Sequence, residues 1–236
     1  MNWSGGKDSA FCLYRVLQSQ IYKVTHLLTN VNAVHDRISM HGVRRSLLQA
    51  QAGSMGIPVD TVELPEQSSM TEYEALMMDK VKVLKDSGCT HSIFGDIFLE
   101  DLRNYREEKL SAAGVSCVFP LWNMDTTDLA RQFIKERFKS IIVCVNDKYL
   151  DSSFCGRLID ESLLNDLPDN VDPCGENGEF HSFVFDGPIF KHRVSFTKGD
   201  IVYRKYTAPK VQDGDCHTTV THQEHGFYFC DLLNTV

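Results

Sequence analysis

The chain has 236 residues, 42% hydrophobic and 24% charged, with a formal net charge of −8, which is the composition of a globular protein with one large or two modest domains. No apolar run approaches the length of a membrane span, and the N-terminus has no charged-then-apolar signal layout, so we expect a cytoplasmic protein without a membrane segment. The negative charge provides no general basic surface for a nucleic-acid backbone, which makes nucleic acid an unfavoured partner.

The first part of the chain predicts helices that alternate with strands. A glycine-rich string at residues 4–9 precedes apolar residues at helical spacing, and residues 22–31 form a buried strand pattern. A second helix is expected over residues 39–55, closed near Gly56, and a strand over residues 57–64.

The alternation continues beyond this strand. Ser69 and Glu72 make a capping box ahead of a helix that carries Tyr73, and residues 92–97 form the next short strand. Crossovers of this length imply a doubly wound parallel sheet with helices on both faces. Ligands of such sheets bind at the carboxyl ends of the strands.

The pattern changes after residue 124, where we place a domain boundary. One more helix and one more strand are followed by short β-type runs that Gly-Pro and Lys-Gly-Asp turns separate. The expected segments are the helix 126–138, the strand 141–145 and the β runs 180–190, 192–196 and 200–206. We therefore expect a nucleotide-binding α/β domain at 1–124 and a smaller α+β substrate-binding domain at 125–236.

The string SGGKDS at residues 4–9 predicts an anion-binding loop. A glycine-rich turn presents consecutive backbone N–H groups, and the N-terminus of the following helix adds a partial positive charge. The string has neither the GxxxxGK[ST] spacing of the Walker loop nor the GxGxxG spacing of dinucleotide folds. A glycine-rich turn that only caps a helix is the structural alternative.

The loop resembles the pyrophosphate loop of the N-type ATP pyrophosphatases, which cleave ATP to AMP and pyrophosphate. The strings FGDIFLEDLRNYREE, VFPLW and CGENGEFHSFVFDGPIFK extend the resemblance to the diphthine–ammonia ligase family, over residues 4 to about 191. This resemblance implies a HUP/Rossmann-like α/β/α fold and ATP-dependent amidation of the carboxylate of diphthine on elongation factor 2. An acyl-adenylate would be the intermediate, and ammonia, free or from a partner, the nitrogen donor.

The resemblance assigns the loop to the leaving pyrophosphate. Its members are Ser4, Gly5, Gly6, Lys7, Asp8 and Ser9. We expect Lys7 to contribute charge rather than packing, because it lies on a loop. Asp8 could hold Mg²⁺, which takes one or two carboxylates plus phosphate oxygens, and a plain helix N-cap is its alternative.

Four further residues are candidates near the nucleotide. His41 and Arg44 open the second predicted helix as nucleotide contacts, although a surface His and Arg explain the same string. Asp96 ends a strand on the ligand-bearing edge and is a candidate catalytic residue, with a turn residue as its alternative. Arg103, which would clamp a carboxylate or phosphate, lies in a charged run that more often forms a solvated helix face.

Glu176 and Glu179 are the candidate substrate-binding residues. Two carboxylates on a glycine-flanked turn suit a cationic ligand, which the trimethylammonium group of diphthine would be. An exposed acidic turn is the alternative, and Asn177 stands where the family more often has glycine.

Other functions of the same superfamily remain as alternatives. A tRNA-modifying enzyme would need a cysteine pair or cluster-binding set, and the eight cysteines contain no CxxC pair. A non-catalytic adenine-nucleotide sensor would need the loop but not the acidic motif. A homo-oligomer is compatible with the sequence.

Two features near the chain ends bear on these expectations. Cys216, His217, His222 and His225 match no zinc spacing, and no metal site is assigned to them. Three residues precede the loop, enough for roughly 10 Å of strand. The first strand is therefore either unusually short or begins upstream of Met1.

Overall fold

The computed structural model describes residues 1–39, 41–66, 68–206 and 225–235. Its helices are α1 (Lys7–Ser19), α2 (Arg45–Met55), α3 (Met70–Asp86), α4 (Glu100–Ala112), α5 (Thr126–Lys135) and α6 (Glu161–Asp166), with a 3-10 turn at Ser152–Phe154. Its strands are β1 (Leu27–Asn32), β2 (Arg37–Ile38), β3 (Val59–Leu64), β4 (His91–Ile93), β5 (Ser116–Val118), β6 (Lys139–Asn146), β7 (Phe180–Asp186), β8 (Phe196–Tyr206) and β9 (His225–Asn234).

The first part of the chain forms parallel strand pairs joined by the N-terminal residues. β1 runs parallel to β3, and β4 runs parallel to β5. Between them, Asn2 N–H donates to the Ile93 carbonyl at 2.9 Å and Trp3 N–H donates to the Leu28 carbonyl at 2.8 Å. The segment before the loop thus acts as a very short strand between β1 and β4. The predicted parallel pairing is confirmed for these strands, whereas the two-residue β2 runs antiparallel to β1.

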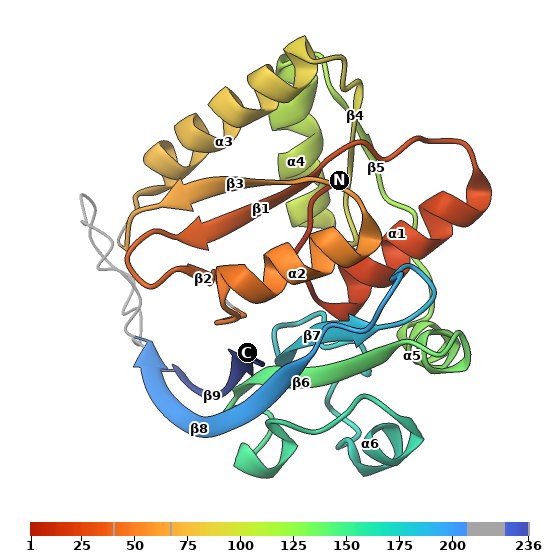
Figure 1. The fold of residues 1–236 in the computed structure, drawn as a ribbon, viewed down its shortest axis with the longest axis vertical. Coiled ribbons are helices and arrows are strands. Elements are labelled where there is room, and N and C mark those ends of the chain that lie inside the picture. The colour runs from red at the N-terminus through yellow and green to blue at the C-terminus, as the bar shows by residue number, and fades with distance from the viewer. Residues whose placement is uncertain (40, 67, 207–224, 236) are drawn as a thin grey trace, which may run out of the picture.

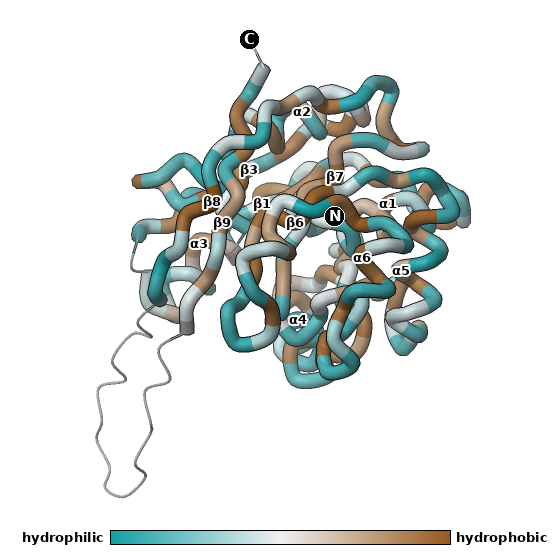
Figure 2. Tube along the Cα trace, turned by 90° about the horizontal axis from the view of Figure 1, so that it is seen from below, coloured by the Kyte–Doolittle hydropathy of each residue, from teal (hydrophilic) through white to brown (hydrophobic). Residues whose placement is uncertain are grey.

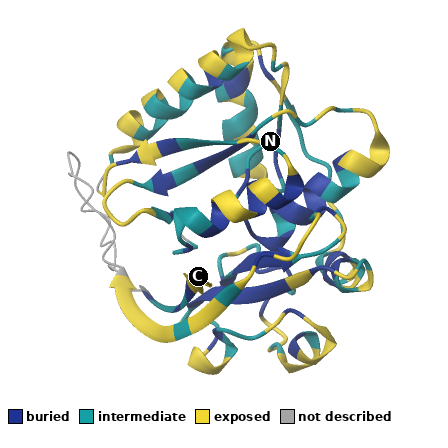
Figure 3. Cartoon of the chain, in the orientation of Figure 1, coloured by how far each residue is buried: buried dark blue, intermediate teal, exposed yellow. Residues whose placement is uncertain are grey.

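Helices cover both faces of these strands (Figure 1). α3 and α4 lie on one face, and α1 and α2 lie on the other, where the second sheet follows. That sheet has the order β7-β6-β9-β8, with antiparallel neighbours. α1 and α2 are therefore enclosed between two sheets, and Figure 3 shows most of α1, β6 and β7 as buried.

The two parts of the chain share a single large hydrophobic core. Phe11 of α1 contacts Phe133 of α5 and Phe138, edge to face, with ring centroids 6.2 and 6.0 Å apart. Phe183 of β7 belongs to the same cluster and is fully buried. Hydrophobic colour accordingly concentrates on strands in the middle of the molecule, while the outer loops are largely hydrophilic (Figure 2).

Local signals in the first part located the elements but not all of their ends, since the strand predicted at 22–31 begins at Leu27 and the one predicted at 92–97 ends at Ile93. The Ser69 hydroxyl accepts from Glu72 N–H at 3.2 Å, which confirms Ser69 as the N-cap of α3, and Gly56 ends α2 with φ +72°. The predicted start of this helix at residue 39 was wrong. Gly42 has φ +69° in a turn that reverses the chain, and this left-handed conformation cannot continue a helix.

The predicted Lys-Gly-Asp turn was also wrong. β8 is continuous through it, because the register moves from Lys198 opposite Leu232 to Ile201 opposite Cys230. The three steps on β8 against two on β9 are a β-bulge, which absorbs one extra residue and bends the strand without ending it.

Two further sequence observations concern membrane-spanning helices and the cysteine and histidines near the end of the chain. Among the described residues, no helix combines the length and apolar character needed to cross a bilayer. The tail residues Cys216, His217 and His222 lie outside the described part of the chain.

Candidate active site

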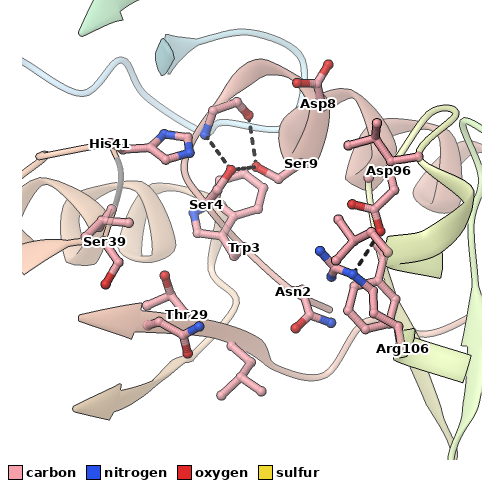
Figure 4. A pocket seen from close by; sticks show the side chains of 18 of the residues that line it. Asn2, Trp3, Ser4, Asp8, Ser9, Thr29, Ser39, His41, Asp96 and Arg106 are labelled. Atoms are coloured by element: carbon pink, nitrogen blue, oxygen red, sulfur yellow. Dashed lines mark hydrogen bonds and ion pairs between the residues drawn. The ribbon is translucent and has the colours of Figure 1, made fainter. Parts of the chain in front are cut away.

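A cavity of about 550 Å³ lies beside residues 28–30 of β1 and opens at the carboxyl ends of the short strand at residues 1–3 and of β4. Its lining comes from both parts of the chain, since Ser4, Asp8 and Asp96 share it with Glu176 and His181. Figure 4 shows the loop residues Ser4 and Ser9 between two walls, one with His41 and the other with Asp96. This is the edge at which a parallel sheet binds its ligands.

The predicted anion loop has a defined shape at the start of α1. The Ser4 hydroxyl accepts from Gly6 N–H at 3.3 Å and lies 3.2 Å from the Ser9 hydroxyl, which itself donates to the Gly6 carbonyl at 2.9 Å. Gly5 has φ +78°, a conformation that glycine adopts without strain. The loop and the amino end of α1 together make the geometry that favours anions.

Lys7 differs from the expectation that it serves as a loop charge. It is the first residue of α1, it is 2% exposed, and its ammonium pairs with the Asp8 carboxylate. Burial alone lowers the pKa of Lys7, but Asp8, Cys174 and Glu176 together raise it above the ordinary value. The ammonium therefore stays charged directly behind the cavity wall, which Asp8 forms.

Arg106 was not among the residues expected near the nucleotide, but it lines the cavity where Arg103 was expected. Its guanidinium lies 3.1 Å from Asp96 in the cavity wall, although burial still raises the pKa of Asp96. Arg103 instead forms an ion pair with Glu107, with 2.9 Å between Nε and Oε1. Its guanidinium carbon lies 4.6 Å from the centroid of the Trp122 ring. Arg103 therefore lies outside the cavity lining, against aromatic rings and only partly exposed, and the two arginines differ by only one helical turn.

His41 lies in the turn before α2 and lines the cavity. Its Nδ1 is 3.2 Å from the Ser182 carbonyl, and its ring stacks on His181 with centroids 4.6 Å apart. Burial lowers the pKa of His41 to about 4 and that of His181 to about 3. His181 was missed, because nothing in its local sequence distinguishes it from other polar residues of a strand.

Arg44 is not brought to the cavity. Its Nη2 lies 2.7 Å from the Asp231 carboxylate, which also accepts from Arg37 at 2.8 Å. Among the described residues, the cavity lining includes His41 but not Arg44. The contact ties the turn that carries His41 to β9.

The acidic turn separates its two glutamates. Glu176 lines the cavity and accepts from Ile97 N–H at 2.7 Å. Glu179 is 1% exposed and turned inward, where it accepts from Asp172 N–H at 3.0 Å and from the backbone and side chain of Asn177 at 2.9 and 3.0 Å. Glu179 therefore stabilises the turn, and Asn177 supplies a donor that glycine would lack.

Glu176 provides a pH-dependent test of this arrangement. Burial, with a contribution from Asp8, raises its pKa to about 7 from an ordinary 4.5. A raised pKa in the folded state stabilises the protein below the unfolded pKa and loses that contribution as pH rises through the folded pKa. We expect the unfolding free energy of the wild type, relative to Glu176→Gln, to fall between about pH 4.5 and 7 and then level off.

Chemical denaturation of both proteins at pH 4.5, 5.5, 6.5 and 8 measures this difference. Glu179→Gln serves as the comparison, because its carboxylate is already enclosed by N–H donors. A difference that stays constant with pH for Glu176→Gln would contradict a buried, proton-binding Glu176.

The architecture and the cavity together describe an α/β protein in which a glycine-rich loop at a helix N-terminus, a geometry that favours anions, opens onto the cavity. The family description "Diphthamide synthase N-terminal domain" matches residues 1–116, and "Diphthamide synthase C-terminal domain" matches residues 125–215. The chain belongs to the diphthamide synthase family, which confirms the resemblance found in the sequence.

Curated relatives carry the name diphthine–ammonia ligase. The human protein is 24% identical over 221 residues, covering 84% of this chain and 82% of the relative. The Bos taurus protein is 25% identical with the same coverage, and the Danio rerio protein is 24% identical over 81% of this chain and 83% of its own length.

Proposed function

We propose that this protein is a diphthine–ammonia ligase that adenylates a substrate carboxylate and then exchanges AMP for ammonia. The observation that carries the proposal is the convergence on one cavity of an anion loop from the first part of the chain and Glu176 from the second. The shared family and the names of the relatives support the same activity.

The reaction proceeds in two balanced steps. A carboxylate oxygen attacks the α-phosphorus of ATP, and the bond to the β-phosphate breaks to release pyrophosphate. The lone pair of ammonia then attacks the acyl carbon, AMP leaves, and one proton is released as the amide forms. In this scheme the loop binds the leaving pyrophosphate, while Arg106 and Lys7 offset its negative charge.

Asp8 and Asp96 suit a magnesium ion that accompanies ATP. Both line the cavity, and Oδ2 of Asp96 is buried without an aligned hydrogen bond. Such a carboxylate oxygen matches the preference of Mg²⁺ for carboxylate and phosphate oxygens. When bound, the ion would supply charge neutralisation for the phosphates.

Only Glu176 of the predicted glutamate pair keeps a role toward the cationic group. Its carboxylate reaches the cavity from the second part of the chain, so a trimethylammonium there could lie beside it while the substrate carboxylate reaches ATP. The diphthine substrate is carried on a protein, as on an elongation factor, which fits a cavity open at the sheet edge.

The proposed fold is the doubly wound HUP type for the first unit. Its strands would then run in the order β3, β1, residues 1–3, β4 and β5, which the hydrogen bonds of Asn2 and Trp3 support. We propose the boundary between residues 124 and 125, with the second unit completing the cavity.

Product analysis tests the activity. With ATP, ammonium and a trimethylammonium-bearing carboxylate, we expect AMP, pyrophosphate and an amide. The matched control is the neutral carboxylate in which a tert-butyl group replaces the trimethylammonium, and it should react more slowly. Release of ADP and phosphate would contradict adenylation, and ATP binding without turnover would indicate a nucleotide sensor.

A further inference from the structure

Gln51 is a polar side chain in an apolar position. It lies on the face of α2 that also buries Leu47, Leu48 and Met55, and it is 0% exposed. An amide buried in such surroundings costs free energy unless its polar atoms are hydrogen-bonded. Its partners therefore explain why glutamine occupies this position.

The amide of Gln51 bonds three groups from three separate segments. Its oxygen accepts from the Trp3 indole N–H at 3.0 Å. Its nitrogen donates to the Gly5 carbonyl at 3.0 Å and to the Val184 carbonyl at 2.6 Å. The indole nitrogen can only donate, which fixes which end of the amide faces Trp3.

The bond from Gln51 reaches Gly5, the residue of the anion loop that has a positive φ. The Gly5 carbonyl also accepts from Val184 N–H at 2.9 Å, so β7 and α2 hold the same carbonyl. A side chain at Gly5 would place its Cβ 2.8 Å from the Gln51 oxygen, which shows how closely the loop is folded onto the amide. The loop shape thus depends on contacts from both parts of the chain.

We infer that Gln51 is a positioning residue that fixes the anion loop between α2 and β7. The functional consequence rests on the proposed function, since a loop that holds pyrophosphate must be ordered before ATP binds. Loss of the two amide donors would free the Gly5 carbonyl from α2 while leaving Lys7 and Asp8 unchanged. The carbonyls of Gly5 and Val184 require a hydrogen-bond donor at position 51, which a side chain of equal volume without N–H groups would not supply.

Gln51→Met tests the inference, because methionine keeps the length of the side chain but removes its donors. Gln49→Met is the matched control, as Gln49 lies on the same helix and is exposed. Trp3→Phe is a second control, because it removes the indole donor from the core but leaves the amide donors of Gln51 to the Gly5 and Val184 carbonyls in the chain.

Hydrogen–deuterium exchange of residues 4–9 without nucleotide is the first readout, and ATP affinity by calorimetry is the second. We expect faster loop exchange and about tenfold weaker ATP binding for Gln51→Met alone, since a lost positioning bond costs about 1.4 kcal/mol. Trp3→Phe should lower the melting temperature without changing loop exchange.

Unchanged loop exchange in Gln51→Met, or exchange that rises equally in Trp3→Phe, would overturn the inference. If Gln51→Met does not fold, Gln51→Asn decides, because its shorter amide cannot reach both carbonyls. A wild-type protein that does not bind ATP would overturn the proposed function instead, while loop exchange would still decide the role of Gln51.

Discussion

Replacing Lys7 with methionine should lower kcat/KM for ATP by about 10²- to 10³-fold, the usual loss when one preorganised charge is removed. The structure adds a second effect, because the substitution leaves the Asp8 carboxylate without its partner in the cavity wall. An unpaired negative charge there repels the triphosphate. Turnover should therefore fall for two reasons: the positive charge of Lys7 is lost, and the negative charge of Asp8 is left without a partner.

The same substitution should also reduce stability. Breaking a fully buried pair costs about 3–5 kcal/mol, and the cost here should be smaller because the Asp8 side chain is 33% exposed. The double variant Lys7→Met with Asp8→Asn should regain much of the stability but not the turnover. Steady-state kinetics and chemical denaturation of both variants measure the two effects separately.

Lys23→Met provides the matched control, since Lys23 is exposed at a distance from the loop along the chain. It should change neither kcat/KM nor the unfolding free energy. If the loss of turnover in Lys7→Met only follows the fraction of unfolded protein, Lys7 has no role in nucleotide chemistry.

Replacing Gly95 with alanine should damage the site through the backbone. A Cβ at Gly95 would lie 3.0 Å from the backbone carbon and oxygen of Asp8 and 3.2 Å from the Ser9 nitrogen. These atoms belong to the first turn of α1 and cannot move as a flexible side chain could. We expect a loss of about 1–3 kcal/mol of unfolding free energy, together with weaker ATP binding, because overpacking displaces the start of α1 from the segment that follows β4.

Gly53→Ala is the control for this variant. Gly53 lies inside α2, and a Cβ there meets nothing within 4 Å among the described atoms. Alanine in a helix interior should stabilise the protein by about 0.5–1 kcal/mol, so the two substitutions should shift the melting temperature in opposite directions. A Gly95→Ala protein as stable and as active as the wild type would contradict the close packing of the segment after β4 on the start of α1.

The sequence by itself determined most of the local elements, and it pointed to the loop and to Asp96, which both line the candidate site. Ser69 and Gly56 mark helix ends because caps depend on hydrogen bonds within one turn. The SGGKDS string predicted an anion loop for a similar reason, since glycine conformation and a helix N-terminus are local properties. Asp96 followed from the rule that parallel strands present their carboxyl ends at one edge.

Tertiary structure decided which side chains reach the cavity. Arg106 and Arg103 differ by one helical turn, and Arg106 is the one on the face of α4 that meets Asp96, in the segment after β4. Glu179 turns inward because Asp172 and Asn177 present N–H donors to it once the turn has closed.

The anion loop itself shows the same division. Its composition predicts an anion-binding loop. The shape of the loop, however, depends on Gln51 and Val184, which are 46 and 179 positions from Gly5 along the chain. The burial of Lys7 likewise requires Ser182 of β7 to pack on the start of α1. No local pattern encodes such contacts, because they form only when the core shared by the two parts brings distant segments together.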